Sequence, residues 1–123
     1  MMKTVLLALI IALTATPALC GNILIPGYDT IHFSADKTVQ EVRFRNPIEN
    51  SCSFMMSLTL ADGTPVWIAD ELLYPGEMFM RIDLEKTLRR GTYRNAKMKY
   101  ECFSLEDNAR MNGAEIKLTI EAE

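Results

Sequence analysis

The chain has 123 residues, 49% of them hydrophobic, and its 13 Lys and Arg against 16 Asp and Glu give a net charge of −3 at pH 7. This length supports one small domain with its own core and no more. The mildly acidic balance argues against nucleic-acid binding, which depends on concentrated positive charge.

The first twenty residues have the three-part layout of a secretory signal peptide. Lys3 supplies a positive charge, residues 5–13 are an unbroken apolar run (VLLALIIAL), and small residues follow. A membrane-spanning helix needs about 20 apolar residues, and Pro17 would end this one too early. We therefore expect a signal peptide at 1–20 and a domain at 21–123 that is secreted or associated with the cell envelope, without a membrane span.

The residues before Cys20 depart from a lipidation signal, because Leu19 and Pro17 stand where bacterial lipoproteins carry small side chains. Cleavage after Ala18 or after Cys20 fits the preference of ordinary signal peptidase about equally well. If Cys20 is removed, two cysteines remain, and they can pair in an oxidising compartment. We expect cleavage near residues 18–20.

Beyond this segment, apolar and polar residues alternate along most of the chain, which indicates half-buried strands. The clearest strands are expected at residues 53–60, 77–84 and 115–122. Their expected inward side chains are Phe54, Met56, Leu58 and Leu60, then Met78, Met80, Ile82 and Leu84, then Ile116, Leu118 and Ile120. Weaker strands are expected at residues 23–25, 30–33, 38–45, 66–69 and 93–103.

Turn dipeptides separate these strands: Pro26-Gly27, Pro75-Gly76 and Asn112-Gly113. Seven or eight short strands without a convincing helix predict an all-β fold, an antiparallel β-sandwich. The strand order resembles the immunoglobulin-like topology, with Tyr93 in the place of its corner tyrosine. An antibody-type domain is not predicted, because Ala96 stands where an Asp is expected before the Tyr-x-Cys triplet.

Six short landmarks occur in order along the chain: Ile25-Pro26-Gly27, Arg45-Asn46-Pro47, Tyr74-Pro75-Gly76, Gly91-Thr92-Tyr93, Lys99-Tyr100-Glu101-Cys102 and Asn112-Gly113-Ala114-Glu115. Together they resemble small secreted or lipid-anchored, immunoglobulin-like sandwich proteins of Gram-positive gut bacteria. That family carries no established activity. The resemblance therefore implies a fold and export rather than a particular chemistry.

Cys52 and Cys102 are expected to form a disulfide. Cys52 opens one predicted strand and Cys102 closes its antiparallel neighbour, so the two ends should lie within disulfide reach. Closing a loop of this length would stabilise the domain by about 4 kcal/mol on the chain-entropy model. The alternative is a pair of buried free thiols.

The same topology gathers three connections at one end of the sandwich, at residues 46–51, 70–76 and 103–113. Long loops on a rigid scaffold commonly bind partners, and the last of these is long for a hairpin. The apolar triplet of residues 72–74 either seals the core or contacts a partner. The candidate binding residues are Asn46, Pro47, Glu49, Leu72, Leu73, Tyr74, Phe103, Glu106, Asp107, Asn108, Arg110 and Met111.

Neither a catalytic site nor a metal or cofactor site is predicted. His32 is the single histidine, and it lies far from both cysteines in the expected topology. The acidic stretch 106–108 lacks the ligand frame of a calcium loop. Met56, Met78 and Met80 are expected to fill the core rather than to bind copper.

We therefore expect an exported, non-enzymatic binding module, a monomer or weak oligomer, that contacts a protein or glycan through the clustered loops. One alternative is a chagasin-like inhibitor of a secreted protease, because Asn46-Pro47 is faintly similar to the Asn-Pro-Thr-Thr-Gly motif of those inhibitors. Another is a structural subunit that pairs through an edge strand.

Overall fold

The computed structural model describes residues 23–123, so the predicted signal peptide, its cleavage site and Cys20 lie outside the described residues. Within this range the chain is all-β and contains no helix, hence none long and apolar enough to cross a membrane. The strands are β2 (Thr30–Phe33), β3 (Val39–Arg45), β4 (Cys52–Thr59), β5 (Pro65–Ile68), β6 (Met78–Asp83), β7 (Gly91–Ser104) and β8 (Arg110–Ala122).

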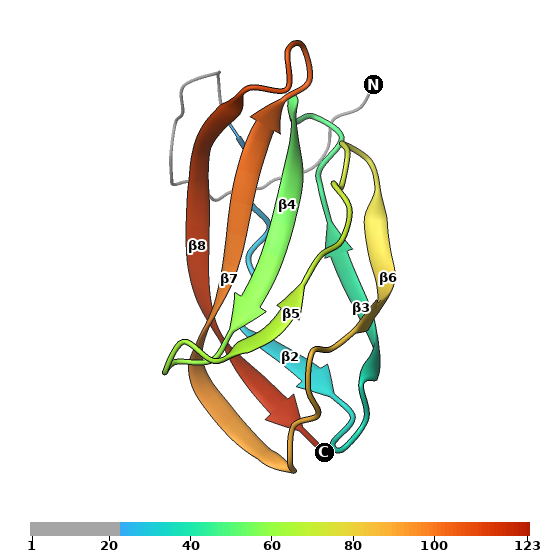
Figure 1. Ribbon diagram of the computed structural model, residues 1–123, viewed down its shortest axis with the longest axis vertical. Coiled ribbons are helices and arrows are strands. Elements are labelled where there is room, and N and C mark those ends of the chain that lie inside the picture. Colours follow the sequence, from blue (N-terminus) through green and yellow to red (C-terminus); the bar gives the residue numbers. More distant parts are fainter. Residues whose placement is uncertain (1–22) are drawn as a thin grey trace.

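The strands form two sheets that face each other (Figure 1). The larger sheet has the order β2-β8-β7-β4-β5, in which β2 runs parallel to β8 and the other pairs are antiparallel. The smaller sheet is the antiparallel pair β3-β6. Aromatic rings join the two, since the ring centroid of Trp67 on β5 lies 5.6 Å from that of Phe44 and 5.5 Å from that of Phe79. The core therefore sits between the sheets.

Strand β4 supplies the centre of this core. Phe54, Met56 and Leu58 are fully buried, as the alternation of their sequence predicts. On the neighbouring β7, Met98 and Tyr100 are buried on the same side. Burying a side chain of this size stabilises a fold by about 1.5–3 kcal/mol, so these two central strands contribute much of the stability.

The predicted inward face of β6 is wrong at two positions. Met78 and Met80 are 40% and 59% exposed, whereas Ile82 is buried as expected. The cause is a bulge: between two successive paired positions β3 has one residue more than β6, and the alternation on β6 changes phase there. Phe79 consequently takes the inward position and packs against Trp67.

The strand expected at residues 23–25 is also absent. The backbone N–H of Leu24 donates to Asn50 Oδ1 (2.7 Å), and Asn50 Nδ2 donates to the Leu24 carbonyl (2.9 Å). A side-chain amide thus takes the place that a neighbouring strand would occupy. This segment is held by the side chain of Asn50 rather than by backbone hydrogen bonds to a neighbouring strand.

The expected turn at Asn112-Gly113 is instead part of β8. The register between β7 and β8 shifts next to these two residues, which places them in a bulge opposite Glu101. Both strands therefore run further than expected, and their connection shortens from the predicted 103–113 to residues 105–109.

Candidate functional site

Three connections lie together at one end of the molecule: 46–51 after β3, 69–77 before β6, and 105–109 between β7 and β8 (Figure 1). The Gly76 N–H donates to the Asn46 carbonyl (2.7 Å), and the Leu105 N–H donates to the Ser51 carbonyl (3.4 Å). Backbone hydrogen bonds thus join the first connection to each of the other two. The three connections are therefore adjacent.

Asn46 is the centre of this arrangement, and its side chain is only 1% exposed. Its Nδ2 donates to the carbonyls of Cys52 and Leu73, both at 2.9 Å, and its Oδ1 accepts from Asn50 Nδ2 at 2.8 Å. Every hydrogen-bonding atom of the amide is therefore used inside the protein. The candidate binding residue Asn46 holds the connections together and does not face a partner.

Asn50 extends the same network to the segment before β2, through its paired hydrogen bonds with Leu24. Sequence reasoning missed this residue. The available signal was a second asparagine four positions after Asn46, with the turn-forming Pro47 between them. The Pro47 carbonyl accepts the Asn50 N–H at 3.1 Å, which closes that turn.

The residues of the apolar triplet 72–74 differ in exposure: one seals the core, and another is exposed to solvent. Leu73 is buried and exchanges two backbone hydrogen bonds with Phe54, at 2.8 and 2.9 Å, so it seals this end of the core. Leu72 is half-buried. Tyr74 is 45% exposed, and its backbone N–H is fixed by Glu77 Oε1 at 2.8 Å.

Each connection exposes one large apolar side chain at this end. Ile48 is 63% exposed, Tyr74 45% and Leu105 47%. We call these three residues the apolar tips. Ile48 lies over the next connection, because its Cδ1 is 3.2 Å from the position that a Cβ at Gly76 would take. Ile48 and Leu105 were not among the candidate residues, although an isolated apolar residue inside a turn sequence was a signal for each.

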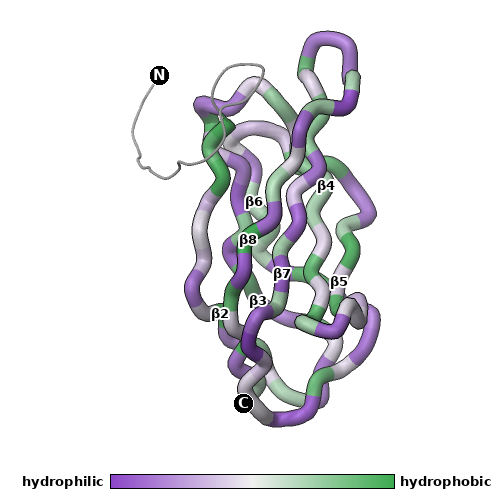
Figure 2. The backbone as a smooth tube through the Cα atoms, turned by 90° about the vertical axis from the view of Figure 1, so that its left-hand side faces the viewer, coloured by the Kyte–Doolittle hydropathy of each residue, from purple (hydrophilic) through white to green (hydrophobic). Residues whose placement is uncertain are grey.

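The polar residues of the β7–β8 connection are used mainly to form its turn, which Figure 2 shows projecting at this end in mostly hydrophilic colours. Asp107 Oδ1 accepts the Ala109 N–H (3.1 Å), and Asn108 adopts a left-handed conformation with φ of 59°. Glu106 is exposed. Within residues 23–123 no group of three or more potential metal ligands occurs.

At the base of this connection, Arg110 is tied to its neighbours on β7. Its Nη2 lies 3.1 Å from Glu101 Oε2, and its guanidinium lies 6.0 Å from the centroid of the Phe103 ring. Met111 is half-buried beside them. These contacts stiffen the start of β8 beneath the projecting turn.

The expected disulfide is not present: Cys52 and Cys102 are both buried, and no S–S bond joins them. Cys52 stands opposite Ser104 and Cys102 opposite Phe54, so the cysteines are diagonal rather than direct partners. Diagonal positions are typically about 7–8 Å apart, beyond the usual Cα separation of a disulfide. A hydrogen bond with the Cys102 side chain lowers the pKa of the Cys52 thiol, against the opposing effect of burial.

His32 lies on the exposed side of β2, with its Nδ1 3.8 Å from a carboxylate oxygen of Glu123.

Comparison of the chain with protein-family models, with curated proteins and with solved structures found no match. Its function must therefore be inferred from these residues themselves.

Proposed function

We propose that the protein is an exported, non-enzymatic binding module of immunoglobulin-like sandwich architecture that contacts a partner protein through the apolar tips. The observation that carries this proposal is that three separate connections each expose one large apolar side chain at the same end. Single exposed apolar residues are ordinary on protein surfaces, whereas several grouped on one face mark contact sites. An apolar group with a tyrosine favours a protein over a glycan.

The buried amides beneath the apolar tips support this proposal. Asn46 and Asn50 fix the connections 46–51 and 69–77 before any partner arrives. Loops that are already ordered lose less conformational entropy on binding, so more of the contact energy appears as affinity. A surface built on fixed loops is what a binding module needs.

The immunoglobulin-like assignment is supported by the division into a five-stranded and a two-stranded sheet. It is also supported by Tyr93, whose hydroxyl donates to the Arg89 carbonyl at 2.8 Å, as a corner tyrosine does. The comparison with chagasin-like inhibitors depends on Asn46-Pro47. Because the Asn46 side chain is buried, we do not extend that comparison to function.

The test is a triple variant with Ile48→Ser, Tyr74→Ser and Leu105→Ser. Its matched control carries Val39→Ser and Ile68→Ser, which alter exposed apolar residues on β3 and β5, outside the three connections. Both variants and the wild type would be used to capture proteins from the envelope and medium of the producing cells, with recovery measured by mass spectrometry.

We expect the triple variant to remain folded and to lose a protein that the wild type and the control both retain. Equal recovery by all three forms, or recovery of carbohydrate alone, would contradict the proposal. Thermal unfolding of each form shows that a loss of binding is not a loss of fold.

A further inference from the structure

Among residues 23–123, two strand edges without a neighbouring strand face each other on one side of the molecule. β2 pairs with β8 alone, and β3 pairs with β6 alone. A cavity of about 500 Å³ lies between the two edges. It is lined by residues 30–33 of β2 and 41–44 of β3, with Tyr28 and Met80 at its margins. We call this cavity the edge slot.

The edge of β2 presents backbone groups to the slot. The Asp29 carbonyl accepts a hydrogen bond from Thr119 on β8 (2.9 Å), and the Phe33 carbonyl accepts one from Glu123, the residue after β8 (3.0 Å). Backbone groups of successive strand residues alternate between the two edges. Those of Thr30, His32 and Ser34 therefore face the slot.

The edge of β3 does the same from the opposite side. The Thr38 carbonyl accepts a hydrogen bond from Leu84, the residue after β6 (2.8 Å). The Arg43 carbonyl and the Arg45 N–H point away from β6 and meet the Tyr28 hydroxyl, at 3.4 and 3.3 Å. The same alternation turns the backbone groups of Glu41 toward the slot.

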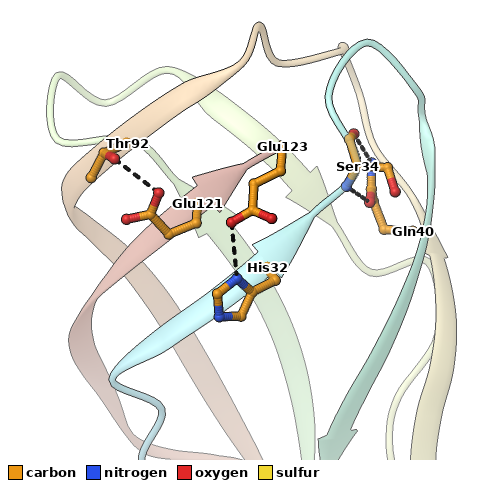
Figure 3. Close-up of polar contacts among 6 residues, drawn as sticks. All are labelled: His32, Ser34, Gln40, Thr92, Glu121 and Glu123. Carbon is orange, nitrogen blue, oxygen red and sulfur yellow. Dashed lines mark hydrogen bonds and ion pairs between the residues drawn. The ribbon is translucent and has the colours of Figure 1, made fainter.

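At one end of the slot, a side chain occupies the position that an added strand would take. The N–H of Ser34 donates to Gln40 Oε1 (2.7 Å), and Gln40 Nε2 donates to the Ser34 carbonyl (2.9 Å), as Figure 3 shows. A residue of a neighbouring strand makes the same pair of bonds. Within the described chain no hydrogen bond reaches the slot-facing backbone groups of Thr30, His32 or Glu41.

The floor of the slot is apolar, because the side chains of Ile31, Phe33 and Phe44 that line it are buried core residues. An extended segment presents alternate side chains to such a floor and to solvent. The unpaired stretch between Ser34 and Tyr28 has room for roughly five residues, a common strand length.

The charges at the rim restrict the solvent-facing side chains of an occupant. His32 has Glu123 beside it, and Glu41 stands opposite Arg81 on β6. Arg43 stands at the bulge near Met80 instead, and among the described residues no carboxylate lies within 4.0 Å of its guanidinium. An acidic side chain is its complement.

We propose that the edge slot binds an extended segment of a partner polypeptide by strand addition, with apolar side chains on the floor and an acidic side chain beside Arg43. Main-chain hydrogen bonds supply affinity in this mode of recognition, and alternate side chains supply specificity. The slot is formed by β2 and β3, whereas the apolar tips lie on the connections at one end, so the two sites are separate.

The probe is a labelled synthetic peptide, acetyl-Val-Glu-Val-Glu-Val-amide, and its binding to the purified protein is measured by fluorescence anisotropy. His32→Pro removes the slot-facing N–H, and the ladder to β8 does not use that group. His32→Ala is the matched control, because it removes the imidazole and keeps the N–H. We expect His32→Ala to bind like the wild type and His32→Pro to bind at least fivefold more weakly.

Two further comparisons keep the outcome decisive if His32→Pro does not fold. The same peptide with N-methyl groups on alternate amides should bind the wild type at least fivefold more weakly, and Arg43→Glu should prefer a Val-Lys peptide to the Val-Glu peptide. Absence of binding at millimolar peptide, or equal binding of the methylated peptide, would overturn the proposal. The triple variant of the apolar tips should bind the peptide like the wild type; if it does not, the peptide occupies the other site.

Discussion

Asn46 is a case in which one side chain connects chain segments that lie far apart in the sequence. It joins the start of β4 to the connection before β6, and through Asn50 it reaches the segment before β2. The three hydrogen bonds of the Asn46 side chain are buried. In a protein interior a neutral hydrogen bond contributes about 1 kcal/mol net, but a lost partner costs about 1–3 kcal/mol.

Asn46→Ala should therefore reduce the free energy of unfolding by about 3 kcal/mol, since it removes three buried hydrogen bonds, to Cys52, Leu73 and Asn50. Urea unfolding followed by tryptophan fluorescence measures the change, because Trp67 is in the core. Glu49→Ala, at an exposed position of the same connection, should change it by less than about 0.5 kcal/mol. A loss below about 1 kcal/mol for Asn46→Ala would show that water replaces the amide.

The sequence could not reveal this role for Asn46. A polar residue between a strand and a proline is most simply interpreted as an exposed loop residue. The Leu73 carbonyl that accepts a hydrogen bond from the Asn46 side chain lies 27 positions away. The exposure of Ile48 and Leu105 was hidden for the same reason, because the neighbours that would cover them are set by the tertiary fold. Residue type predicts preference for the interior, but not the neighbours found there.

At the scale of strands, the alternation of apolar and polar residues predicts well where each strand lies. It predicts which side chains face the core only where the pairing of strands is regular. The strand predicted at residues 30–33 has the same bounds as β2. On β4, the predicted inward side chains Phe54, Met56 and Leu58 are buried. The failures at Met78 and Met80 come from a bulge that depends on the partner strand. A bulge inserts one extra residue on one side of a ladder. The sequence of either strand by itself does not reveal it, because the bulge depends on how the two strands pair.

The second bulge gives a test at Gly113. A Cβ at this position would lie 2.3 Å from the backbone oxygen of Tyr100, which cannot move without disturbing the ladder between β7 and β8. Gly113→Ala should destabilise the protein by about 2 kcal/mol or more, in the range of overpacked sites. Gly27→Ala is the control, because nothing lies within 4 Å of a Cβ there. Equal thermal unfolding of the two variants would mean that the bulge relaxes freely.

At the scale of the whole molecule, the prediction of an all-β protein with two sheets follows from periodicity and turn spacing alone. The sequence could not show how the segment before β2 is attached. Asn50 holds it at one end, and Tyr100 on β7 holds it further along, where the hydroxyl donates to the Pro26 carbonyl at 3.3 Å. Burial, and then the proximity of Tyr28, raise the pKa of Tyr100 well above its ordinary value.

This raised pKa couples the stability of the whole fold to alkaline pH. Below the unfolded-state pKa of about 10 the neutral phenol is present in both states. Above it the unfolded chain releases a proton that the folded chain retains, so stability falls as the pH rises toward the folded pKa. Tyr100→Phe loses one hydrogen bond, about 1 kcal/mol, at neutral pH, but it also removes this alkaline loss.

We therefore expect the wild type to be the more stable form at pH 7 and its advantage to shrink or reverse above pH 10. Urea unfolding at both pH values measures the difference, and phenolate absorbance reports the ionisation directly. A constant difference between the two forms across this range would contradict the assignment.

The parallel pairing of β2 with β8 also determines how the domain bears a mechanical load. Thr30 to Phe33 lie beside Thr119 to Ala122 and run in the same direction. A pull that draws the beginning of β2 and the end of β8 apart acts along the strands, so the hydrogen bonds between them are sheared together instead of opening one at a time. The domain should therefore resist tension applied between the start of β2 and the end of β8 better than if the same hydrogen bonds opened in sequence.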